Sequence, residues 1–152
     1  MTPVFSSEHA YGKCHALTAA LLEFAPAGEA MGLFLDGSCI HSAFRVPNTD
    51  VLVDAFGPEA GAEALSTKAA RFTRGGSEPF EWRRLADDDL KRMVHGDRSR
   101  AVRQARPVAR GLLRAADELA SSPPTLLSGA PGGGLRLLAS PAIERAVEVG
   151  LR

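Results

Sequence analysis

Three short strand-like runs separated by two tight turns constrain the fold of this chain more than any other feature. The runs are AMGLFL at 30–35, CIHSAFRV at 39–46 and VLVDA at 51–55. Asp36-Gly37 between the first two is a strong two-residue hairpin signal, and Pro47–Asp50 is a cluster of turn residues. Because connections this short join antiparallel neighbours, the pattern predicts an antiparallel meander.

Helical patterns flank these runs on both sides. HALTAALLEF at 15–24 is rich in strong helix formers, carries apolar residues at helical spacing, and is followed by Pro26 and Gly28. The later part of the chain predicts helices at 59–70, 90–95 and 98–119, the last kinked or restarted at Pro107, and a strand at 79–85. We therefore expect an α+β fold in which one helix packs on a small antiparallel sheet, followed by a helical C-terminal half.

The 152 residues suit one domain, which we place at 1–120. The segment SSPPTLLSGAPGGG at 121–134 is typical of a flexible linker. Ser140-Pro141 is a good start for a short final helix at 142–149. Residues 121–152 are thus predicted to be a linker and a C-terminal helix.

No apolar run approaches the roughly 20 residues that cross a bilayer, and MTPVFSSEHAYGK lacks the regions of a signal peptide. We expect no membrane span, and a protein that is cytoplasmic or delivered without a classical signal peptide. The two cysteines, Cys14 and Cys39, are too few for a disulfide framework and are expected to be free thiols.

Cys14 lies at or just before the first turn of the predicted helix at 15–24. A helix N-terminus and a neighbouring imidazolium both lower the pKa of a thiol and make it a stronger nucleophile. The second condition requires a histidine brought near by the fold, and that histidine needs an acceptor that orients it.

The hairpin after Val46 supplies such a pair. If its turn is centred on residues 48 and 49, Pro47 faces Asp50 and His41 lies opposite Phe56. Asp54 is then the diagonal neighbour of His41 on the same face, within reach of its ring. A slip of one residue would place Asp54 on the other face.

The order Cys14, His41, Asp54 resembles that of papain-like and transglutaminase-like cysteine hydrolases. Gly12–Leu17 looks like the nucleophile helix, and HSAFRVP at 41–47 with VLVDAFG at 51–57 look like the His and Asp strands of small bacterial and phage-associated members. The resemblance implies a thiol-dependent hydrolase, a peptidase or deamidase, acting on an amide, isopeptide or ester bond of a protein or peptide-like substrate, without a cofactor. An intracellular or delivered effector fits this size.

Papain-like proteases place a Gln before the cysteine to help bind the oxyanion, and this chain has none there. His9 or Tyr11 is the candidate donor in its place, together with the backbone N–H of Cys14. His15 is expected on the helix surface, with lining of the cleft as the alternative.

Two other classes of function compete with the hydrolase. Cys39 and His41, two residues apart and therefore expected on one strand face, form a zinc-site alternative with Cys14 and His15 or His9. A non-enzymatic partner-binding module on a degenerate papain-like fold is the other alternative.

Charge is divided along the chain: residues 1–65 carry eight acidic and two basic residues, whereas residues 66–152 carry ten acidic and sixteen basic ones. We expect the two halves to attract each other, with an acidic partner for the second half as the alternative. A stripe of arginines on one helical face is the candidate site for that partner, and a solvated face is the simpler interpretation. Nucleic acid is not expected as a partner, because aromatic side chains that could stack on bases are few and none alternates with these arginines. The stripe is Arg103, Arg106, Arg110 and Arg114.

Overall fold

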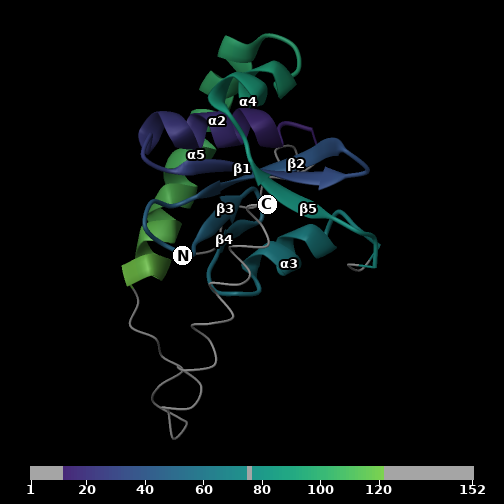
Figure 1. Cartoon of the computed structure of the whole chain (residues 1–152). Helices are drawn as coiled ribbons and strands as arrows, with labels where there is room; N and C mark the ends of the chain where they lie inside the picture. Colours follow the sequence, from purple (N-terminus) through teal and green to yellow (C-terminus); the bar gives the residue numbers. More distant parts are fainter. Residues whose placement is uncertain (1–11, 75–76, 122–152) are drawn as a thin grey trace, which may run out of the picture.

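The computed structural model describes residues 12–74 and 77–121 (Figure 1). It has the α+β fold that the sequence predicts. Its elements are α2 (Cys14–Phe24), β1 (Glu29–Leu35), β2 (Ser38–Arg45), β3 (Leu52–Asp54), β4 (Gly57–Glu59), α3 (Ala64–Ala70), β5 (Glu81–Arg84), α4 (Asp87–Met93) and α5 (Arg98–Ser121).

The strands form one antiparallel sheet in the order β4-β3-β2-β1-β5. The meander from β1 onward confirms the prediction from the short turns. Asp36 and Gly37, between β1 and β2, both have positive φ, 48° and 79°, as a type I′ hairpin turn requires. β5, which comes much later in the chain, pairs with the edge of β1 opposite β2 and forms an outer strand of the sheet.

The register of β2 on β3 is the one that the sequence predicts. Phe44 pairs with Val53 and Arg45 pairs with Leu52, and the N–H of Val46 donates to the carbonyl of Val51 at 3.0 Å. Continued along the strands, this register places His41 and Asp54 on one face of the sheet, because side chains alternate with a period of two.

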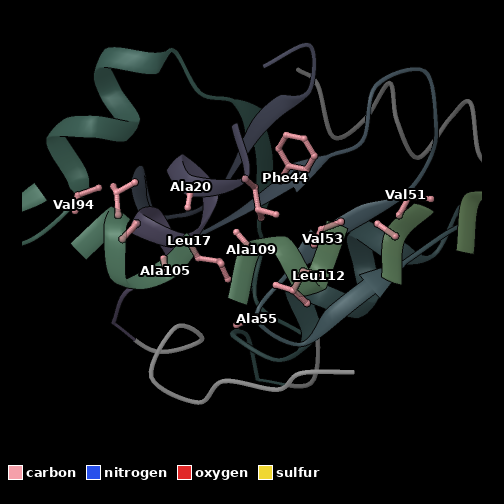
Figure 2. Close-up of a cluster of buried hydrophobic side chains, with 14 residues drawn as sticks. Leu17, Ala20, Phe44, Val51, Val53, Ala55, Val94, Ala105, Ala109 and Leu112 are labelled. Carbon is pink, nitrogen blue, oxygen red and sulfur yellow. The ribbon is translucent and has the colours of Figure 1, made fainter. Parts of the chain in front are cut away.

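Helices cover both faces of the sheet, with α2 and α3 on opposite sides (Figure 1). The larger core lies between α2, α5 and the sheet, where Leu17, Phe44, Val53 and Leu112 meet (Figure 2). On the other face, Leu33, Ala43, Leu52 and Trp82 pack against Leu65 of α3. Alternate strand residues thus enter different cores. His41 and Asp54, two residues from Ala43 and Leu52, belong to the α3 face.

The structure differs from these predictions in several places. Strand β4, for which no strand is predicted, begins at Gly57. The helix predicted from residue 59 starts at Ala64, and the helix predicted at 90–95 is α4, which begins earlier. Pro107 lies inside an unbroken α5. Its side chain is exposed, so the helix accommodates the missing N–H on its solvent side. The predicted linker at 121–134 and final helix at 142–149 lie outside the described residues, apart from Ser121.

Candidate active site

Cys14 is the first residue of α2, with Lys13 at the N-cap. The first backbone hydrogen bond of the helix runs from the N–H of Leu17 to the carbonyl of Lys13, 3.1 Å. The N–H groups of Cys14, His15 and Ala16 therefore have no acceptor within the helix, as at every helix N-terminus. These donors and the helix dipole stabilise negative charge at the end of α2, where the thiol lies.

His41 and Asp54 form a buried pair, each with 1% of its surface exposed or less. Nε2 of His41 lies 3.0 Å from Oδ2 of Asp54. Oδ1 of Asp54 accepts the N–H of Phe56 at 3.0 Å. Asp54 thus holds the imidazole and caps the turn after β3.

Lys68 of α3, which the sequence analysis did not identify, completes the surroundings of Asp54. Its side chain is fully buried, and Nζ donates to Oδ1 of Asp54 at 2.7 Å. It also donates to the carbonyl of Gly57 at 2.9 Å and to Oε1 of Glu59 at 3.3 Å. These three bonds use all three donors of an ammonium group.

The other ring nitrogen of His41, Nδ1, is buried and has no hydrogen-bond partner in the described part of the chain. Because Nε2 is occupied by Asp54, Nδ1 is the nitrogen available to the Cys14 thiol. The ring of Phe72 stacks on the imidazole, with ring centroids 4.0 Å apart and an interplanar angle of 23°. Asp54 and Phe72 together fix the position of His41.

The ionisation of the three groups is coupled. Burial raises the pKa of Cys14, but the imidazoles of His15 and His41 outweigh it and lower the pKa from 9.0 to about 5. Burial lowers the pKa of His41, and Asp54 and Cys14 reverse this and raise it. The pKa of Asp54 is lowered in spite of burial, by His41 and Lys68. A thiolate–imidazolium pair is therefore the favoured state near neutral pH.

His15 is buried, with 8% of its surface exposed, so the expected position on the helix surface is wrong. Its Nδ1 lies 2.9 Å from the hydroxyl of Ser42 on β2, because α2 packs this face of the helix against the sheet. Its side chain lines the hollow at the thiol, which is the alternative that the sequence analysis kept open.

A hollow of about 310 Å³ opens over the thiol. The described residues that line it are Gly12, Cys14, His15, Cys39, Ile40, Phe72 and His95. None of them carries a carboxylate, a lysine or an arginine, so a neutral group fits this hollow best. The two predicted oxyanion donors His9 and Tyr11 lie outside the described residues.

The pairing of β2 with β1 argues against the zinc-site alternative, which expected Cys39 and His41 on one strand face. A bulge shifts the register there, since Leu33 pairs with His41 but Phe34 pairs with Cys39. Ile40 is the extra residue, so Cys39 and His41 lie on opposite faces, contrary to the expectation. Across residues 12–74 and 77–121 there is no group of three or more His, Cys, Asp or Glu able to hold a metal ion. Both thiols are free.

The arginine stripe on α5 is exposed at all four positions. Two of its members make contacts with the end of α2. Arg106 pairs with Glu23 at 2.9 Å, and the guanidinium of Arg110 lies 5.2 Å from the ring centre of Phe24. Together with the pair of Arg71 and Glu59, these contacts show the attraction between the acidic and basic halves. None of the described helices is long and apolar enough to span a membrane.

The structure therefore brings Cys14, His15, His41 and Asp54 together, as the sequence indicates for the trio, and adds Lys68 and Phe72. Ala64, Leu65, Lys68 and Ala69 share the buried side of α3, so the helical spacing of Lys68 with three apolar residues was the signal available for it. In comparisons with known proteins, no family model, no curated protein and no solved structure matches this chain.

Proposed function

We propose that this protein is a thiol-dependent hydrolase of the papain-like kind, acting on an amide, isopeptide or ester bond of a protein or peptide-like substrate. The observation that carries the proposal is the buried line of groups at the thiol. Asp54 holds Nε2 of His41 at 3.0 Å, Nδ1 is left for Cys14, and Cys14 lies at the start of α2.

In the first half of the reaction, the Cys14 thiolate attacks the carbonyl carbon of the substrate and forms a C–S bond. The negative charge that develops on the carbonyl oxygen lies near the N–H groups at the start of α2, which have no acceptor within the helix. Protonated His41 then gives its Nδ1 proton to the leaving nitrogen or oxygen as the substrate bond breaks. Asp54 keeps the ring in the tautomer and orientation that this transfer needs. A thioester on Cys14 is the result.

Water completes the reaction by hydrolysing the thioester, which releases a carboxylic acid and restores the thiol. If a second substrate amine takes the place of water, the same trio performs acyl transfer. If the leaving group is ammonia from a side-chain amide, the reaction is a deamidation.

The experiment uses p-nitrophenyl acetate, a neutral activated ester that transfers its acetyl group to reactive thiols. The wild-type protein should release one equivalent of nitrophenolate in a rapid burst, and peptide mass mapping should locate the acetyl group on Cys14. Cys14→Ala should abolish the burst. His41→Ala should slow the burst by about 10²-fold or more. A wild-type protein without a burst, or a burst that persists in Cys14→Ala, would contradict the proposal.

A non-enzymatic binding module is the alternative that the same experiment tests. In that case Cys14 is an ordinary buried thiol, and its acetylation is slow and independent of His41. An acidic partner at the arginine stripe stays a prediction.

A further inference from the structure

A chain of hydrogen bonds at the start of α2 determines which nitrogen of His15 carries a proton. The hydroxyl of Thr18 donates to the carbonyl of Cys14 at 3.0 Å. A hydroxyl has one hydrogen, so in the 2.9 Å contact of Thr18 with Ser42 the donor must be Ser42. Ser42 has then no hydrogen left for His15, and Nδ1 of His15 must donate to it over 2.9 Å.

The tautomer of His15 follows from this count. With its proton on Nδ1, a neutral imidazole presents a lone pair at Nε2. Thr18 and Ser42 are each 1% exposed, so solvent does not compete for these bonds and the tautomer is fixed. Nε2 of His15 is thus the nitrogen that lies beside Cys14: it donates to the thiolate, and it accepts a proton once acylation has removed the charge from the sulfur. Its orientation is set by α2 and β2 rather than by Asp54.

The two imidazoles differ in their access to the hollow over the thiol. His15 lines this hollow together with Cys14, whereas His41 is not among the described residues that line it. His41 is fully buried, its Nδ1 is closed off from solvent, and Phe72 stacks on its ring. Nδ1 of His41 therefore meets only a group held at the Cys14 sulfur, such as the leaving group, whereas a free water molecule that enters the hollow after acylation meets His15.

We propose that His15 is a second catalytic base, which activates the water that hydrolyses the thioester on Cys14, while His41 serves the acylation half. This inference rests on the proposed cysteine hydrolase. In the step, the water oxygen forms a C–O bond to the thioester carbon and gives one proton to Nε2 of His15. The C–S bond then breaks, its electron pair returns to the Cys14 sulfur, and a carboxylic acid leaves. His15 afterwards passes its proton through the Cys14 sulfur to Nδ1 of His41, which restores the thiolate–imidazolium pair.

The test separates the two halves of p-nitrophenyl acetate hydrolysis, since the burst reports acylation and the steady-state rate reports deacylation. The variant is His15→Asn, whose amide nitrogen can replace Nδ1 as the donor to Ser42 but which has no group at the place of Nε2. Because His15 also lowers the pKa of Cys14, the burst should be slower in the variant but keep its amplitude of one equivalent. The steady-state rate should fall by about 10²-fold, with the acetylated Cys14 peptide accumulating in mass spectra.

Ser42→Ala is the second variant, and it keeps the imidazole while removing the acceptor of Nδ1–H. Its burst should also persist, and its deacylation should slow less than in His15→Asn, because the ring can then rotate or change tautomer. This variant decides the question if His15→Asn does not fold, as judged by a thermal melt.

The outcomes distinguish this inference from the proposed function. A full burst followed by deacylation at the wild-type rate in the variant would overturn the role of His15 and leave the hydrolase intact. If the burst is lost in His15→Asn but kept in Ser42→Ala, where the imidazole is still present, His15 is needed for acylation. That result would also overturn the inference. Absence of a burst in the wild-type protein refutes the hydrolase and the role of His15 together.

Discussion

Lys68 holds Asp54 from the side opposite His41: its Nζ lies 2.7 Å from Oδ1, while Nε2 of His41 lies 3.0 Å from Oδ2. One carboxylate thus joins α3 to β2, and each of its oxygens faces a buried cationic or protonated group. The ammonium of Lys68 favours the ionised form of Asp54, which in turn favours the imidazolium form of His41.

Replacement of Lys68 should therefore be costly to stability. Lys68→Met removes the ammonium and leaves Asp54, the Gly57 carbonyl and Glu59 with fewer partners in a buried place. Loss of one member of a buried ion pair destabilises by about 3–5 kcal/mol, which urea unfolding measures. Lys91→Met is the matched control, because Lys91 and its partner Asp87 are 47% and 66% exposed. It should cost about 0.3–0.5 kcal/mol. Equal effects of the two changes would contradict the role given to Lys68.

The contribution of Asp54 to stability should depend on pH. The pKa of Asp54 in the folded protein is lower than its ordinary value of 3.8. Just below pH 3.8 the folded state therefore binds fewer protons than the unfolded state. The stabilisation is complete above pH 3.8 and is lost as the pH falls through the folded pKa. The difference in unfolding free energy between wild-type protein and Asp54→Asn should be largest above about pH 4 and should shrink progressively as the pH falls below 3.8 toward the folded pKa.

A control for this pH series is Asp88→Asn, which changes an exposed carboxylate in the first turn of α4. Its effect should stay below about 1 kcal/mol at every pH. A gap between wild-type protein and Asp54→Asn that is constant from pH 2 to 7 would show that the carboxylate charge does not contribute.

The two thiols should differ strongly in reactivity. The pKa of Cys14 is lowered to about 5, whereas burial raises that of Cys39 to about 11. At pH 7 Cys14 is almost fully ionised and only about one Cys39 in ten thousand is. Limited alkylation at pH 7 followed by peptide mass mapping should therefore find label on Cys14 alone. Comparable labelling of Cys39 would be inconsistent with the surroundings described for both residues.

Much of the site could be predicted because it depends on local chemistry. Positive φ at Asp36 and Gly37 follows from the residue types in the turn. The even-membered turn after Val46 then fixes the register of Phe44 on Val53 and with it the face that His41 shares with Asp54. A helix whose first residue is Cys14 follows from the Ala- and Leu-rich run behind it.

The remainder depends on contacts between distant segments. Strand β4 has three residues, one of them Pro58, and shows no alternation that would reveal it. A lysine on a short helix is usually solvated, and only the position of α3 on the sheet brings Lys68 to Asp54. The bulge at Ile40, which separates the faces of Cys39 and His41, arises from the pairing of β2 with β1. The burial of His15 needs the docking of α2 on Ser42.

The central claim is that Cys14 and His41 form an activated pair, and the rate of iodoacetamide modification of Cys14 against pH tests it most directly. A thiolate of low pKa is intrinsically a weaker nucleophile, so the midpoint of the profile is the decisive quantity and not the absolute rate. The account predicts a midpoint near 5 for the wild-type protein and a midpoint in His41→Ala that moves by about a unit or more toward 9.0. A wild-type midpoint near the ordinary thiol value, or one that His41→Ala leaves unchanged, would contradict it.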